Sequence, residues 1–431
     1  MTPADGPSQR RFARLRIGRI ALDITPLRTS RDFRVLWIGL FVSDLGYQFA
    51  LVAMFVQVYR LTGSAGKVGL IGLFSLVALI AGSIVSGAVV DAYDRRKLLM
   101  LSQVGLAIGA TMLLAGALAG RPSVWLVYAA ASITAGVSAV DNPTRSAMTP
   151  RLVGTALVPS AMALNQVVWN AVGLLGPAVG GVLIAHLGLS WAYGFDLVTY
   201  GAAFLTAILV APMPPVPLGV GEEATATGWA AVKEGFAFVR DSRLLQSTFA
   251  IDLIAMIFGL PRALFVVLAA TQFHRGPQVV GLLFSAPALG ALLGALTGGW
   301  VKHVSRQGMA VVWAVIGWGA SIAAFGLVGR HLALALVFLA MGGWADVISA
   351  IFRSTILQLS VPERLRGRLS AIHILVVTGG PRLGDFEAGV VAQVFSPALS
   401  VVSGGLACIV GAGLVAAVYS ELRRYRARTA T

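Results

Sequence analysis

The chain has 431 residues, of which 57% are hydrophobic and only 12% are charged, whereas an average soluble protein is about 25% charged, so an ordinary soluble domain is excluded. The formal net charge of +15 does not indicate a nucleic-acid partner, because the basic residues gather at the chain ends and in every second connection and form no aromatic-plus-basic patch of the kind that reads bases. This composition favours an integral membrane protein whose surroundings are the lipid bilayer.

The first part of the chain predicts a bundle of six membrane-spanning helices. Residues 1–30 form a basic N-terminal segment without an apolar run that ends in a cleavage site, so no removable signal peptide is predicted. Residues 31–212 then hold six apolar runs of the length, about 20 residues, that a spanning helix needs. We place these spans at 35–59, 68–90, 98–119, 124–144, 160–187 and 191–212.

A more polar stretch separates this bundle from a second one. Residues 213–243 begin with three prolines and continue with several charges, which predicts a cytoplasmic linker. Residues 244–420 predict a C-terminal six-helix bundle, and residues 421–431 form a basic tail. We place its spans at 244–272, 279–301, 309–328, 332–352, 369–395 and 399–419. The predicted fold class is therefore an all-α membrane protein with twelve transmembrane helices.

The distribution of lysine and arginine orients the chain in the membrane. Of the 33 basic residues, 26 fall in the termini and the even-numbered connections, and five fall in the odd-numbered connections. Cytoplasmic segments are enriched in both residue types. We therefore expect a protein of the cell inner membrane with both termini in the cytoplasm.

The two bundles are related in sequence at an offset of 208 to 212 residues. Asp44 matches Asp252, and Arg145 matches Arg353, each arginine being followed by a serine. Both copies run in the same direction, which is the parallel repeat found in several transporter folds.

The connection after the second span carries a recognisable motif. Residues 87–97 read Gly-Ala-Val-Val-Asp-Ala-Tyr-Asp-Arg-Arg-Lys, which resembles the signature loop of the major facilitator superfamily. Physically, a glycine allows two helices to approach closely, and a carboxylate at the membrane edge can meet a helix N-terminus or an arginine. The simpler alternative is that the basic residues only anchor the loop in the cytoplasm. The resemblance implies a cytoplasmic gate that contains Gly87, Asp91, Arg95, Arg96 and Asp141.

Two further stretches narrow the resemblance. Gly176, Pro177, Gly180 and Gly181 resemble a stretch of exporters of this superfamily, which implies outward transport; the alternative is close packing at a proline kink. Residues 380–389, together with residues 141–145 and 252–262, resemble the branch that contains enterobactin exporters and is called transmembrane secretion effectors. This resemblance covers essentially the whole chain.

Charged residues inside the spans are the candidates for proton coupling and substrate binding, because a charge at the bilayer centre costs about 2.5 to 3.5 kcal/mol. Asp44 and Asp346 lie near mid-depth of their spans, and Glu387 has no evident local partner. Arg382 and Asp385 share one helix face and form either a permanent ion pair or a functional one. The candidates for proton coupling are Asp44, Asp346, Asp385 and Glu387, with His373 as a weaker one. The candidates for substrate binding are Gln48, Asp252, Arg262 and Arg382.

The rival classes of function lack their motifs. The chain contains no phosphate-binding loop for ATP, and its five histidines show no metal-binding or catalytic spacing. Its one cysteine, Cys408, allows neither a disulfide nor a thiolate metal site within one chain. We therefore predict a monomeric secondary transporter without ATP, metal or cofactor. It would use the proton gradient to export a siderophore or related metabolite; the alternative is multidrug or macrolide efflux.

Overall fold

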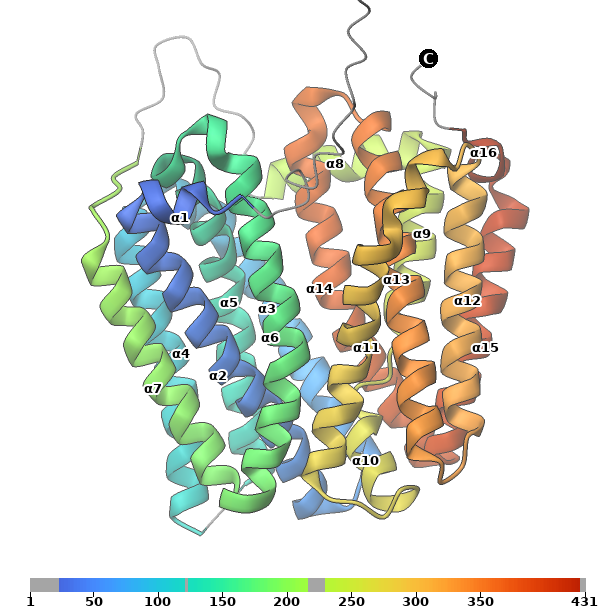
Figure 1. The fold of residues 1–431 in the computed structure, drawn as a ribbon, viewed down its shortest axis with the longest axis horizontal. Helices are drawn as coiled ribbons and strands as arrows, with labels where there is room; N and C mark the ends of the chain where they lie inside the picture. Colours follow the sequence, from blue (N-terminus) through green and yellow to red (C-terminus); the bar gives the residue numbers. More distant parts are fainter. Residues whose placement is uncertain (1–22, 121–122, 216–228, 427–431) are drawn as a thin grey trace, which may run out of the picture.

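Two helical bundles stand side by side in the structure (Figure 1). The computed structural model describes residues 23–120, 123–215 and 229–426, and every element in these ranges is a helix. The first bundle consists of α1 (Thr25–Thr29), α2 (Arg31–Thr62), α3 (Ala65–Ala92), α4 (Arg95–Leu118), α5 (Val124–Val153), the short η2 (Thr155–Leu157), α6 (Val158–Leu187) and α7 (Leu189–Leu209).

The second bundle follows a helix of the linker, α8 (Trp229–Asp241). Its elements are α9 (Arg243–Phe258), α10 (Leu264–Thr271), α11 (Pro277–Thr297), the short η3 (Gly298–His303), α12 (Gln307–Leu327), α13 (Leu332–Ser360), α14 (Glu363–Val394), α15 (Pro397–Val418) and α16 (Ser420–Arg424).

Local sequence fixes where several of these helices begin and end. The side chain of Ser30 accepts a hydrogen bond from the backbone N–H of Phe33 and so caps α2, and Ser64 caps α3 in the same way. Between them, Gly63 adopts the left-handed conformation (φ 60°) that ends α2, which suits a residue without a Cβ atom. A two-residue turn therefore sends the chain straight back into the membrane.

Twelve crossings result, as the sequence predicted. Ten described helices are long and apolar enough to span a bilayer, by length and composition. The other two crossings are the broken pair α9 and α10 and the more polar α14, which runs the height of the bundle in Figure 1. Figure 1 also places α1 and α16 at the same end of the molecule, as an even number of crossings requires.

Two predicted spans are too short. The fourth and tenth spans were expected to end at Thr144 and Phe352, whereas α5 continues to Val153 and α13 to Ser360. Arg145 and Arg353 therefore lie inside helices and are buried, although the charge count assigned them to cytoplasmic connections. Buried partners for these arginines, described below, explain why the helices can continue past them.

The bundles touch each other through α3 with α14 and α6 with α11. A Cβ atom added to Gly389 would lie 2.8 Å from the Cα of Gly69, and one added to Gly181 would lie 3.0 Å from the Cα of Gly281. Only glycine allows backbones to come this close. These contacts lie toward the end opposite to α1 and α16. The ribbons of the two bundles diverge toward the end that carries α1 and α16 (Figure 1).

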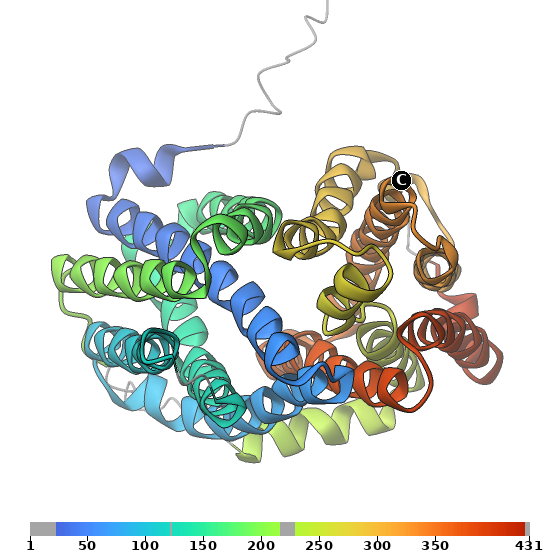
Figure 2. The same ribbon diagram turned by 90° about the horizontal axis from the view of Figure 1, so that it is seen from below.

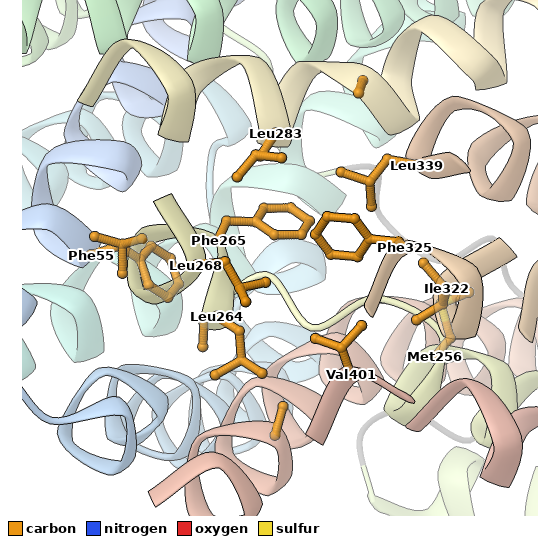
Figure 3. Packing of buried hydrophobic residues seen from close by; sticks show 14 of the residues in the cluster. Phe55, Met256, Leu264, Phe265, Leu268, Leu283, Ile322, Phe325, Leu339 and Val401 are labelled. Carbon is orange, nitrogen blue, oxygen red and sulfur yellow. The ribbon is translucent and has the colours of Figure 1, made fainter. Parts of the chain in front are cut away.

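The helix α10 fills the bundle at this closed end. Its residues from Leu264 to Ala269 are all buried, and Figure 3 shows Phe265 and Leu268 enclosed by side chains of several other helices. The ring of Phe265 lies 5.1 Å from that of Phe284 on α11, which also lies 5.7 Å from Phe55 of the first bundle. This apolar packing, worth about 1.5 to 3 kcal/mol for each large side chain, closes that end of the molecule.

The predicted linker, residues 213–243, is partly helical. Its residues 216–228 lie outside the described ranges, and α8 occupies most of the remainder. Figures 1 and 2 show α8 lying across the bundle axis. Phe238 and Val239 pack against the apolar cluster at the ends of α9, α13 and α14, which fixes α8 to the second bundle.

Candidate functional site

A cavity of about 270 Å³ lies between the two bundles. Four polar side chains and three aromatic rings contribute to its walls: Gln48, Asn170, Arg262 and Asp346, with Trp169, Phe284 and Trp318. The first bundle supplies α2 and α6, and the second supplies the α9–α10 connection and helices α11, α12 and α13. Mostly apolar walls with a few polar groups are typical of a site for a small molecule.

The seventh crossing is interrupted where it meets this cavity. α9 ends at Phe258 and α10 begins at Leu264, so the predicted continuous span 244–272 is wrong on this point. Pro261 lacks an N–H group and disfavours helical conformation in the residue before it, Leu260. Leu260 and Arg262 line the cavity. Non-helical backbone is tolerated at membrane depth where it lines a cavity of this kind.

Asp385 of α14 holds this break in place. Its Oδ2 lies 2.9 Å from Nη2 of Arg262, and its Oδ1 accepts a hydrogen bond of 3.0 Å from the backbone N–H of Ala263. Ala263 is the N-cap residue of α10, where unpaired N–H groups attract a negative charge. The side chain of Asp385 is 3% exposed, so both of its oxygens are used in binding the broken helix.

The ion pair predicted between Arg382 and Asp385 is wrong, because the carboxylate turns to Arg262 on another helix. Arg382 instead donates a hydrogen bond from Nη1 to the carbonyl of Thr378 on its own helix. Its backbone carbonyl meets α3 at Gly72, where an added Cβ would lie 2.3 Å away. Arg382 is not among the residues that line the cavity, so the two arginines predicted to bind substrate, Arg262 and Arg382, occupy different places.

Four ionisable side chains of the second bundle form a buried network. Nη2 of Arg353 lies 3.2 Å from Oδ1 of Asp252 and 3.5 Å from Oδ1 of Asp346, and Nδ1 of His373 lies 3.2 Å from Oδ2 of Asp252. Asp252 and Arg353 are 1% and 3% exposed, whereas Asp346 reaches the cavity. Asp252, a candidate for substrate binding, is thus enclosed and paired instead of facing the cavity.

Arg353 is the residue of this network that the sequence analysis did not predict, because the tenth span was expected to end at Phe352. Its position after the predicted tenth span placed it in a connection. The repeat offered a signal in the sequence, since Arg145, followed by a serine, stands at the matching position of the first half. A basic residue that recurs at one position of both halves indicates a shared structural position.

The first bundle contains the related pair Arg145 and Asp141. Nε of Arg145 lies 2.6 Å from Oδ2 of Asp141, and Nε2 of Gln103 donates a hydrogen bond of 2.9 Å to Oδ1. Asp141, predicted as part of a gate, is therefore enclosed between α4 and α5. Asp196 on α7 is also buried, and no described residue forms a hydrogen bond with its Oδ1.

Two of the predicted proton-coupling acids, Asp44 and Glu387, form no hydrogen bond or ion pair with any described residue. Asp44 lies on α2 one turn before Gln48, which lines the cavity, but Asp44 itself does not. Glu387 is half-buried on α14 and precedes exposed Val390 and Val394 by about one and two turns. Of the four acids, Asp346 alone lines the cavity.

The signature loop is bound to its own bundle. The side chain of Asp94 accepts hydrogen bonds from the backbone N–H groups of Arg96 and Lys97 and caps α4. Arg96 donates to the carbonyls of Ala207 and Ile208 at the end of α7, and Nη1 of Arg95 donates to the carbonyl of Ala147 on α5. Gly87 lies within α3, and the side chain of Asp91 lies outside the described part, so its predicted contact with these arginines stays a prediction.

The exporter-like stretch of α6 lies where three helices cross. An added Cβ on Gly176 would lie 2.7 Å from Cβ of Gln48, and one on Gly180 would lie 3.0 Å from the ring of Phe49, both on α2. The carbonyl of Pro177 faces α11 of the other bundle, where the backbone of Gly281 approaches it. Gly181 continues the same contact, so the stretch joins α2, α6 and α11 beside the cavity.

The sequence of this chain matches a known protein family over nearly its whole length. The family described as transmembrane secretion effector matches residues 22–430. The enterobactin exporter EntS of Citrobacter koseri is 27% identical over 405 residues, which cover 94% of this chain and 96% of that protein.

Comparison with solved structures supports the same fold. The nucleoside transporter NupG, as its D323A mutant, is similar with a TM-score of 0.73 at 12% identity, covering 90% of this chain and all of that one. A bacterial homologue of the lysosomal transporter Spinster, in an inward-facing and unoccupied conformation, has a TM-score of 0.71 at 14% identity, covering 91% of this chain and 98% of that one. At these identities the likeness concerns the fold alone.

Proposed function

Because the chain belongs to the transmembrane secretion effector family of major facilitator transporters, we propose that it exports a small molecule by proton antiport with alternating access. The observation that carries this proposal is the cavity between the bundles, whose wall contains both an acid, Asp346, and a cation, Arg262. The packed end with α10 and the diverging opposite end are the features that one facing state of such a transporter requires (Figure 1).

We propose that the end with α1 and α16 faces the cytoplasm, which makes this state inward-facing. The distribution of basic residues supports this orientation. Substrate would enter the cavity from the cytoplasm, and the bundles would then rock about the α3–α14 and α6–α11 contacts. The glycines at these contacts suit such rocking, because small residues allow helices to slide and separate with little steric resistance.

Asp346 is the acid that we assign to proton coupling. It is 34% exposed on its cavity side and has a cation, Arg353, at 3.5 Å on its buried side. A carboxyl in this position can exchange a proton with water in the cavity, and the arginine stabilises its charged form. Coupling requires that protonation and substrate binding each favour one facing state.

The first substrate class that we propose is a siderophore or related metabolite, because the Citrobacter koseri relative is an enterobactin exporter. Arg262 supports it, because a guanidinium in the cavity wall can bind an anionic oxygen. The apolar and aromatic remainder of the wall would also suit multidrug or macrolide efflux, which is the alternative.

Uptake into inverted membrane vesicles tests both substrate and direction. We expect radiolabelled enterobactin to accumulate when the vesicle interior is acidified. Without this proton gradient, we expect no accumulation. Erythromycin under the same conditions tests the alternative. Accumulation of erythromycin alone would overturn the siderophore assignment, and accumulation of neither compound would overturn the proposed substrates and direction.

A further inference from the structure

The network of Asp252, Arg353, Asp346 and His373 connects three helices and has two accessible ends. Asp252 lies on α9, Arg353 and Asp346 lie on α13, and His373 lies on α14. The side chains of His373 and Asp346 are 27% and 34% exposed, while the two groups between them are enclosed. The first and last members of the network are therefore partly exposed, Asp346 to the cavity, whereas its centre is enclosed.

The position of Arg353 suits an exchange between two carboxylates. Its Nη2 lies at similar distances from Asp252 and Asp346, 3.2 and 3.5 Å. Neither facing Oδ1 atom accepts a hydrogen bond from a described residue, and Nε and Nη1 of Arg353 donate none to one. The guanidinium is thus held between two charges and not locked in a two-pronged contact with either, so a small shift favours one or the other.

The charges of the network do not balance without a proton. Two carboxylates face one guanidinium, and the remaining member, the imidazole of His373, is neutral or cationic according to its protonation. An uncompensated charge in the membrane interior is costly, which favours the neutral total. We propose that His373, Asp252, Arg353 and Asp346 form one proton-binding unit that holds a single exchangeable proton, either on His373 or on Asp346.

Arg353 completes both forms of this unit. With the proton on His373, the imidazolium pairs with Asp252 and the guanidinium neutralises Asp346. With the proton on Asp346, the imidazole is neutral and the guanidinium neutralises Asp252. To pass from one form to the other, one of the groups His373 and Asp346 releases its proton to water and the other takes up a proton from water. Both forms therefore have the same total charge. The protonation of His373 thus sets the charge state of Asp346, an acid that it does not touch.

The surroundings of His373 leave it one ionisable partner among the described residues. α14 packs against α3, α8, α9, α10 and α15, of which α10 and α15 contain no acidic or basic residue. α9 supplies Asp252 and the ring of Phe249, whose centroid lies 6.3 Å from that of the imidazole. The described charged residues of α3 and α8 are Lys67, Arg240 and Asp241. None of them forms an ion pair with His373.

Titration of the histidines by NMR tests the unit without requiring transport. The chain has five histidines, and the His373→Gln variant identifies the signal of His373 in ¹⁵N-histidine-labelled protein. The decisive variant is Asp346→Asn, because Asp346 does not contact His373. Removing its negative charge should move the titration midpoint of His373 to lower pH by about half a unit, a proton affinity about threefold weaker.

The matched control is Asp44→Asn, which removes an acid of the repeat-related half that does not share Arg353. We expect it to leave the midpoint of His373 unchanged. A midpoint that is the same in the wild type and in Asp346→Asn, or a His373 that does not titrate, would overturn the unit. The inference rests on the proton coupling proposed above, but its failure is distinguishable: vesicle uptake tests the coupling, and the titration tests the unit.

Discussion

Asp385 on α14 and Arg262 in the break of the seventh crossing lie 2.9 Å apart, although 123 positions separate them in the chain. The same carboxylate accepts the N–H of Ala263 at the start of α10. One acid thus fixes the helix that closes one end of the molecule and the cation that lines its cavity. Closure and cavity charge are therefore expected to change together when this acid is removed.

The first prediction concerns Asp385→Asn. The substitution leaves Arg262 without its counter-ion and weakens the cap of α10, so we expect a loss of about 3 kcal/mol in unfolding free energy. Thermal unfolding of the purified protein in detergent measures it. The double variant Asp385→Asn with Arg262→Gln removes both charges and should recover most of the loss. Equal melting temperatures for wild type and Asp385→Asn would contradict the assignment.

The second prediction concerns the contact between the bundles at Gly69. A Cβ atom there would lie 2.6 Å from the backbone carbonyl of Asp385, so Gly69→Leu should separate α3 from α14. The matched control is Gly317→Leu on α12, where no atom lies within 4 Å of an added Cβ.

Labelling of an introduced cysteine measures this separation. Ser64 donates a hydrogen bond of 2.7 Å to Gln393 across the two bundles, so Ser64→Cys reports on the closed end. The one native cysteine, Cys408, is buried and is replaced by serine in all variants. With Gly69→Leu we expect labelling by an impermeant maleimide to be about tenfold faster, which corresponds to about 1.4 kcal/mol. Unchanged labelling, or the same increase with Gly317→Leu, would argue against closure at this contact.

The third prediction concerns the signature loop. Arg96 binds the last carbonyls of α7, and a partly exposed charged hydrogen bond of this kind contributes about 1 to 2 kcal/mol. Arg96→Gln should therefore lower the melting temperature, while Lys97→Gln, an exposed neighbour, should not. If the two variants melted alike, the loop would not stabilise its bundle through Arg96.

Much of the fold could be predicted from the sequence. The all-helical class with twelve crossings and the resemblance to transmembrane secretion effectors are confirmed, and the chain is a multi-pass inner-membrane transporter and not an enzyme. These features depend on composition and on motifs that are local in the chain. Apolar runs mark crossings because every crossing must satisfy its own backbone in lipid.

The site could be predicted less well, because its contacts join distant helices. The i, i+3 spacing suggested that Arg382 pairs with Asp385, but spacing within one helix carries no information about a competing arginine on another. Arg353 was predicted to lie in a loop, because a span predicted from hydropathy ends at the first charged residue. Hydropathy does not reveal whether that residue has a buried partner, as Arg353 has in Asp252. The break at Pro261 has a local signal in the proline itself, which the apolar run around it concealed.

Asp346 is the acid that we propose to couple proton movement to export, and the most direct test compares three variants of the protein in one vesicle assay. Gradient-driven uptake of radiolabelled enterobactin is measured in inverted vesicles for wild type, Asp346→Asn, Asp44→Asn and Glu387→Gln. We expect Asp346→Asn alone to abolish gradient-dependent accumulation, because this acid alone among the four candidates lines the cavity. Wild-type accumulation in Asp346→Asn, with loss in Asp44→Asn or Glu387→Gln, would contradict the account and assign the coupling to that other acid.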